Sequence, residues 1–201
     1  MISNKHKVIF VHINKTGGTS IESLFSDKSL CSDQQSLKEI KCKIPEKKWD
    51  DFFKFSFVRN PWDRMVSEYF FRKESHKVNP KYWHCPKNLR IDLNISFKEW
   101  LLEDHDEPHS EFLRFQSQIN WLIDDNNKIA VDFIGRFENL EKDIKHVTDS
   151  LSININFPHF NKMNRNHYSL YYDKDTIEIV RKRHQEDIDL FKYKFQNKYL
   201  L

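Results

Sequence analysis

The sequence predicts an α/β fold in which a central, mainly parallel sheet is flanked by helices. Residues 7–13 (KVIFVHI) and 53–58 (FKFSFV) are short, almost continuously apolar runs, which is typical of strands buried on both faces. A third apolar run covers residues 130–134 (AVDFI). Each run precedes a helical pattern, and strands that alternate with helices pair in parallel because the helix carries the chain back across the sheet.

The first two helices are predicted directly after the first two strands. Residues 19–25 carry apolar side chains at helical spacing, after a pair of glycines. Asn60 is suited to cap the next helix, and Pro61 is suited to its first position. One face of this second helix is apolar and consists of Trp62, Met65, Val66, Tyr69 and Phe70.

Weaker patterns predict the remaining elements. Ser96 and either Asp173 or Asp175 are candidate caps of later helices. The polar stretch 73–95 is predicted to be a loop. Further helices are expected over residues 96–103, 111–122 and 140–151, and from the cap at 173–175 to about residue 191, with Ile177, Val180, His184 and Ile188 turned inward.

Length and composition limit the classes of protein to consider. A chain of 201 residues is expected to form a single domain over residues 1–201. Its net charge of +3 favours an anionic ligand but is too weak to indicate nucleic-acid binding. No apolar run reaches the length of about 18 residues that a membrane span needs, and the N-terminus lacks a secretory signal pattern. We therefore expect a cytoplasmic protein, and its 3 cysteines are expected to be free thiols.

The first strand–helix junction, KTGGTS at residues 15–20, is suited to holding a phosphate group. Glycines allow main-chain N–H groups to converge on oxyanions, and the positive end of a helix dipole follows. Lys15 adds a compact charge, and Thr19 and Ser20 add hydroxyl donors. The structural alternative is a tight turn that needs positive φ, with the hydroxyls serving as helix caps. The triphosphate loop G-x-x-x-x-G-K-[ST] does not match, because the lysine here precedes the glycines.

The second junction, FSFVRNPWDRMVSEY at residues 55–69, is also suited to an anion. Arg59 ends the strand and can bind a phosphate through two parallel N–H bonds, while Ser67 lies about two turns into the helix. The structural alternative is that Arg59 pairs with Asp63 or another carboxylate and that Ser67 only packs. Two such junctions in one small sheet favour a ligand with two phosphate-like groups.

Four stretches in this order resemble the sulfotransferase family, in the branch related to the carbohydrate sulfotransferases. HINKTGGTS (12–20) resembles H-x-P-K-T-G-G-T-S, with Asn14 in place of the usual proline, and FVRNPWDRMVSEY (57–69) resembles F-x-R-[ND]-P-x-x-R-x-x-S-x-Y. VDFIGRFENLEKD (131–143) resembles D-F-I-G-R-[FY]-E-N-L. The segment 161–195 resembles the family's C-terminal tail, in which Y-[YF] precedes a last helix and a D-x-x-x-F-x-Y ending. Residues 26–52 and 73–108 match poorly.

The resemblance implies a P-loop-like architecture and a donor, 3′-phosphoadenosine 5′-phosphosulfate (PAPS), from which a sulfuryl group passes to an acceptor hydroxyl or amine. By position, Arg59 and Ser67 would hold the 3′-phosphate, and Lys15 would stabilise the charge that develops on the leaving oxygen. Arg136 is a further donor-site candidate, whose structural alternative is a salt bridge to a nearby glutamate. The residues that would hold the 5′-phosphosulfate are Lys15, Thr16, Gly17, Gly18, Thr19 and Ser20.

The general base is predicted from a looser resemblance. PHSEFLRFQSQINWL (108–122) resembles H-x-x-P-Q-S-x-x-L, although Phe115 replaces the proline and the spacing to Gln116 differs, so His109 is the first candidate for the base. His12, His84, His105 and Glu111 remain alternatives. The four-residue spacing of His105 and His109 would suit zinc on a helix, but Pro108 interrupts that helix, so no metal site is expected.

The acceptor and two rival functions stay open. Family analogy favours a carbohydrate hydroxyl, and the aromatic residues of segment 69–84 could stack on a sugar, although core packing explains the helical ones better. A nucleotide kinase or another P-loop protein shares the strand–loop–helix arrangement but not the motif order. A non-catalytic nucleotide-binding relative would keep the fold without the acceptor chemistry.

Overall fold

The computed structural model describes residues 1–25, 34–78, 91–102, 115–154 and 165–198. Contacts divide the chain into two compact units, which are described separately below. The first unit comprises Met1–Arg59 and Gln116–Asn164, and the second comprises Asn60–Phe115 and Arg165–Leu201. The single domain expected from the chain length stays a prediction.

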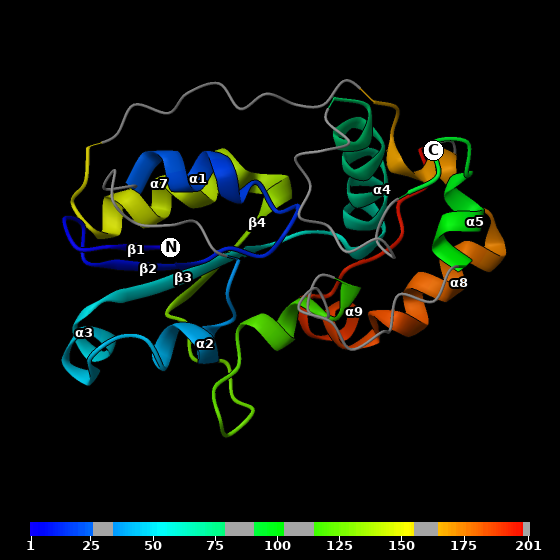
Figure 1. Cartoon of the computed structure of the whole chain (residues 1–201). Coiled ribbons are helices and arrows are strands. Elements are labelled where there is room, and N and C mark those ends of the chain that lie inside the picture. The colour runs from blue at the N-terminus through cyan, green and yellow to red at the C-terminus, as the bar shows by residue number, and fades with distance from the viewer. Residues whose placement is uncertain (26–33, 79–90, 103–114, 155–164, 199–201) are drawn as a thin grey trace. The chain divides into compact units, whose positions relative to one another are not determined.

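A four-stranded sheet forms the centre of the first unit (Figure 1). Its strands follow the order β1 (Ile2–Ser3), β2 (Val8–Val11), β3 (Phe53–Val58) and β4 (Phe133–Arg136). The short β1 pairs antiparallel with β2, whereas β2, β3 and β4 are parallel. The predicted α/β fold with a mainly parallel sheet is confirmed, and β3 has the predicted bounds.

The fourth strand begins later than predicted. The expected run was 130–134, but β4 starts at Phe133, which pairs with Phe55. The main-chain amide of Ala130 instead donates to the carbonyl of Leu122 at 3.0 Å, and Ile129 bridges to Ile123. Ala130 is therefore bonded to Leu122, next to this bridge, and not to β3.

Helices α1 (Gly18–Phe25) and α7 (Leu140–Ser150) cover one face of this sheet (Figure 1). Their apolar side chains share a buried core with alternate residues of β2 and β3, because successive strand residues point to opposite faces. Two short helices, α2 (Leu37–Lys41) and α3 (Glu46–Asp51), lie on the other side of the strands (Figure 1). The core comprises Met1, Val8, Phe10, Ile21, Phe25, Phe55, Phe57, Leu140, Ile144 and Val147.

The second unit is built around α4 (Pro61–Val78), which begins at the predicted residue. The Asn60 side-chain oxygen accepts from the amide of Trp62 at 3.1 Å, which confirms the predicted cap. The helix continues through residues that were expected to form a loop. A buried pair lies just before this extension, where Arg72 donates to Glu68 one turn earlier at 2.9 Å. Within the extension, the Lys73 ammonium donates to the hydroxyl of Tyr69 at 2.9 Å.

The described residues of this unit form three further α-helices, namely α5 (Phe97–Leu102), α8 (Lys174–Arg183) and α9 (Gln185–Phe191). Ser96 accepts from the amide of Glu99 and Asp173 accepts from that of Thr176, as predicted for the two caps. The single long C-terminal helix was wrong, because His184 leaves helical geometry with φ −122° and ψ 30° and separates α8 from α9.

The helix predicted over residues 111–122 is wrong from Gln116 onward, and Phe115 is the one described residue of that range in an α-helix. A 3₁₀ turn, η2 (Gln118–Trp121), follows instead. The Gln118 side chain accepts from the main-chain amide of Arg59, the residue directly after β3. Two other 3₁₀ turns, η3 (Phe137–Asn139) and η4 (Tyr168–Tyr171), precede α7 and α8.

Candidate functional site

The carboxyl ends of the three parallel strands lie at one edge of the first unit's sheet. The KTGGTS loop follows β2, Arg59 follows β3 directly, and Arg136 ends β4 opposite Val58. Ligands of open parallel sheets bind beyond this edge. The structure thus brings three of the predicted anion-binding segments to one edge of the same sheet.

The KTGGTS loop forms a tight turn that opens α1. Lys15 and Gly17 both have positive φ, 65° and 85°, and the Thr16 hydroxyl donates to the carbonyl of Ile13 at 2.8 Å. The Gly17 carbonyl accepts from the amides of Ser20 and Ile21, which begins the helix. Because first-turn amides have no acceptor within a helix, those of Gly18 and Thr19 are directed out of the helix end. The tight turn is therefore compatible with anion binding, because it leaves these N–H donors directed away from the helix.

The two glycines are required for different reasons. Gly17 needs its positive φ. Gly18 has no space for a side chain, since a Cβ placed there would lie 2.0 Å from Cδ2 of His12. His12 stacks on Phe10, and its Nδ1 lies 3.0 Å from the Glu22 carboxylate one helical turn beyond Gly18. The His12–Glu22 pair thus packs α1 closely onto the end of β2.

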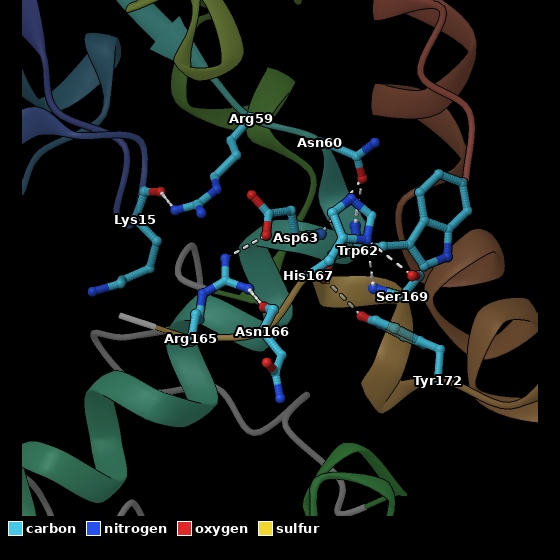
Figure 2. Close-up of polar contacts among 10 residues, drawn as sticks. All are labelled: Lys15, Arg59, Asn60, Trp62, Asp63, Arg165, Asn166, His167, Ser169 and Tyr172. Atoms are coloured by element: carbon cyan, nitrogen blue, oxygen red, sulfur yellow. Dashed lines mark hydrogen bonds and ion pairs between the residues drawn. The ribbon is translucent and has the colours of Figure 1, made fainter. Parts of the chain in front are cut away.

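Arg59 is held by three groups of the first unit. Its Nη1 donates to the main-chain carbonyl of Lys15 at 2.8 Å (Figure 2). Its guanidinium carbon lies 3.8 Å from the centre of the Phe137 ring. The side-chain amide of the buried Gln118 forms two hydrogen bonds with the main chain of Arg59. It accepts from the N–H and donates to the carbonyl, both at 2.9 Å. Figure 2 shows the Lys15 side chain pointing away from the guanidinium, which separates the two positive charges.

The remaining predicted residues of the first unit take different positions. Thr16 is fully buried, Thr19 is exposed and Ser20 is half-buried. The Thr16 hydroxyl proton is used within the turn, so Thr16 can offer a ligand its main-chain amide as a donor. The main-chain amide of Arg136 donates to the Asp143 carboxylate at 2.7 Å, which ties the end of β4 to α7. The role of the Arg136 side chain stays a prediction.

Ser67 belongs to the second unit, where it is buried on α4. Asp63, the expected partner of Arg59 in the structural alternative, forms an ion pair with Arg165 (Figure 2). The Tyr172 hydroxyl donates to the carbonyl of Trp62 at 2.8 Å, and burial raises the pKa of this phenol well above its ordinary value. These contacts fix the first turn of α4 within its own unit.

The candidates for the general base fall mostly outside the described residues. This holds for His109 and for the alternatives His84, His105 and Glu111. His12 is described and is only 6% exposed, with its ring between Phe10 and Gly18. His12 therefore packs β2 against the first residue of α1.

Sequence reasoning missed three residues that shape this edge of the sheet: Glu22, Gln118 and Phe137. Glu22 follows the glycine pair at helical spacing and could have been matched to the histidine before the loop. Gln118 lies 59 residues from its partner in a stretch that was expected to be helical, so the sequence carries no signal for that contact. Phe137 lies in the VDFIGRFENLEKD stretch, but nothing in the sequence indicated its contact with Arg59.

Among the described residues, no three His, Cys, Asp or Glu side chains are grouped as ligands of one metal ion. None of the helices in that part of the chain is long and apolar enough to cross a membrane.

Comparison with known proteins supports the motif pattern over nearly the whole chain. A model of the Sulfotransferase family matches residues 1–194. Carbohydrate sulfotransferase 10 of Danio rerio is 21% identical in an alignment that covers 96% of this chain and 65% of that protein. An uncharacterized protein of Archaeoglobus fulgidus is 29% identical over 57% of this chain and 79% of its own length. The chain therefore belongs to the sulfotransferase family.

Proposed function

We propose that this protein transfers a sulfuryl group from PAPS to a hydroxyl group of a carbohydrate. The observation that carries the proposal is the KTGGTS turn, which ends a parallel strand, opens α1 and is bonded to Arg59 through the Lys15 carbonyl. Membership of the sulfotransferase family supports the transfer chemistry.

The residues around the loop fit a phosphosulfate group. The main-chain amides at the start of α1 have no acceptor within the helix, so they are available to bind an anion. The positive end of the α1 dipole, the Lys15 ammonium and the exposed Thr19 hydroxyl all favour negative charge. Ser20 adds a second hydroxyl, which is half-buried in the same turn.

We assign the charge of Lys15 to the chemical step. Bound PAPS supplies an activated sulfuryl group, and negative charge develops on the bridging oxygen of its 5′-phosphate as that group leaves. A fixed cation next to this oxygen lowers the barrier, because it is already oriented when the charge appears. The positive φ of Lys15 holds its main chain in the turn while the side chain stays directed away from Arg59 (Figure 2).

The 3′-phosphate is assigned to Arg59 and Ser67, with Arg136 as a further donor-site residue, on the strength of the sequence resemblance. Arg59 is suited to the task because a guanidinium can bind two phosphate oxygens at once. Its main chain is already fixed by Gln118, so binding costs less conformational freedom at this residue.

His109 remains the proposed general base that accepts the proton of the acceptor hydroxyl. The carbohydrate acceptor is proposed by analogy with the relative whose name states that class. This chain spans 65% of that relative's length, so the acceptor has to be tested on this protein.

The proposal is tested by the melting temperature with two ligands. A ligand that binds only the folded state raises the melting temperature according to its affinity. We expect 3′-phosphoadenosine 5′-phosphate to stabilise the protein more than ATP with Mg²⁺. Equal or greater stabilisation by ATP would favour a nucleotide kinase-like protein. Stabilisation by the bisphosphate without sulfate transfer from PAPS to any of a panel of saccharides would indicate a non-catalytic relative.

A further inference from the structure

Phe137 contacts both Arg59 and the KTGGTS turn. It is half-buried and opens η3, directly after β4. The guanidinium carbon of Arg59 lies 3.8 Å from the centre of its ring, which is the stacked arrangement of a cation on an aromatic face. A planar guanidinium that lies on a ring at this distance has little freedom to rotate out of plane.

The same ring also contacts the KTGGTS turn. A Cβ placed on Gly17 would lie 3.3 Å from Cδ2 and 3.4 Å from Cε2 of Phe137, so the main chain of the turn passes directly beside the ring. Gly17 has φ 85°, and its conformation depends on the turn keeping this place. The ring therefore supports the residue whose carbonyl begins α1.

A third contact closes the arrangement. Nη1 of Arg59 donates to the carbonyl of Lys15 at 2.8 Å, two residues before Gly17. Phe137, Arg59 and the turn thus contact one another pairwise within one unit. Gln118 fixes the main chain of Arg59, and Phe137 fixes its side chain.

We propose that Phe137 is a positioning residue for the donor, which sets the Arg59 guanidinium relative to the KTGGTS turn. This inference rests on the proposed function. The donor carries both anionic groups on one ribose, so a guanidinium already held beside the turn binds with less loss of conformational freedom. Phe137 acts through Arg59 and contributes chiefly to the affinity for the 3′-phosphate.

The test compares two nucleotides by calorimetry, 3′-phosphoadenosine 5′-phosphate and adenosine 5′-monophosphate. Phe137→Leu removes the aromatic face and keeps an apolar side chain, whereas Phe137→Tyr keeps the face and serves as the matched control. We expect Phe137→Leu to weaken binding of the bisphosphate roughly 5- to 30-fold, the range of a cation–π contact that is partly desolvated. Its effect on the monophosphate should be much smaller, and Phe137→Tyr should bind both nucleotides as the wild type does.

A double-mutant cycle separates positioning from a general loss of structure. In an Arg59→Met background, Phe137→Leu should have little further effect on bisphosphate binding, because the residue through which it acts is gone. In steady-state transfer, KM for the donor should rise while kcat changes little. Phe137→Met provides a second variant if Phe137→Leu does not melt as a folded protein.

Equal weakening of both nucleotides, or full additivity with Arg59→Met, would overturn the inference and leave the proposed function intact. Failure of the wild type to bind the bisphosphate would overturn both the inference and the proposed function, so the two failures are distinguishable.

Discussion

Nη1 of Arg59 and the main-chain carbonyl of Lys15 are joined by a hydrogen bond of 2.8 Å. The bond links the residue that ends β3 to the turn that follows β2, two segments 44 positions apart in the sequence. It uses the carbonyl of Lys15 rather than its side chain, so the ammonium stays directed away from the guanidinium (Figure 2). The two cationic side chains therefore point in different directions at the same edge of the sheet.

Gly18→Ala tests the close packing of α1 on His12. The new Cβ would lie 2.0 Å from Cδ2 of His12, so we expect the free energy of unfolding to fall by roughly 1–3 kcal/mol. His12→Ala should relieve most of this loss, because the conflicting ring is removed. Denaturant unfolding of both single variants and the double variant measures the coupling.

Gly17→Ala is the matched control for this cycle. Its cost comes from the positive φ of 85° and from contacts with Phe137 and Leu140, which His12→Ala does not alter. Equal rescue of both glycine variants by His12→Ala, or no rescue of either, would contradict the packing described for Gly18.

The buried His184 should make the protein less stable at mildly acidic pH. Burial lowers the pKa of His184 well below its ordinary value, and the charges of Arg64 and Arg183 act in the same direction. As the pH falls through about 6.5, His184 therefore becomes protonated in the unfolded chain but stays neutral in the folded chain. Stability is retained above this pH and falls by up to about 1.4 kcal/mol per pH unit below it.

Denaturant unfolding at pH 7.5 and pH 5.5, for the wild type and His184→Gln, checks this prediction. The variant cannot titrate here, so its loss on acidification should be smaller than that of the wild type. The Asp187 carboxylate lies 4.0 Å from Nδ1 of His184 and favours the charged imidazole. If that carboxylate dominated, the wild type would lose less stability than the variant between the two pH values.

Asp173 is expected to stabilise the start of α8 except in strong acid. A side-chain bond from Lys98 and the amide of Thr176 hold the pKa of this carboxyl well below its ordinary value. Because the folded pKa is depressed, the contribution is present above about pH 4 and is lost as the pH falls further. Asp173→Asn should lower the melting temperature at pH 7 and change it less at pH 2.

Asp175→Asn is the control for Asp173, since Asp175 is exposed and lies 3.8 Å from the same Lys98 ammonium. A thermal melt of both variants across the acid range distinguishes the cap from a general effect of surface charge. Identical curves for the two variants would remove the specific role of Asp173.

Much of the first unit followed from local sequence signals. Apolar runs predicted β2 and β3, and the glycine pair predicted the turn into α1, because burial and backbone freedom are properties of neighbouring residues. Strand β4 begins later than predicted because Ala130 is bonded to Leu122 and Ile129 bridges to Ile123. The apolar pattern of residues 130–134 does not reveal these contacts. The break at His184 was missed because the apolar spacing continues through it.

The candidate site was predictable in its residues more than in its contacts. KTGGTS and Arg59 were identified from their chemistry, and the parallel sheet explains why they share an edge. The roles of Gln118, Phe137 and the His12–Glu22 pair depend on tertiary contacts that no spacing in the sequence encodes. The contact of Gln118 with the main chain of Arg59 in particular requires the 3₁₀ turn that replaced the expected helix.

We propose that the Lys15 ammonium stabilises the leaving oxygen of a donor held by the KTGGTS turn. The most direct measurement is the rate of labelled sulfuryl transfer from PAPS to a saccharide, for the wild type and Lys15→Ala, with bisphosphate affinity measured in parallel. We predict that the variant still binds the bisphosphate and that kcat falls about 100- to 1,000-fold, as expected when one preorganised charge is removed from the transition state. Transfer by Lys15→Ala at the wild-type rate would contradict the claim.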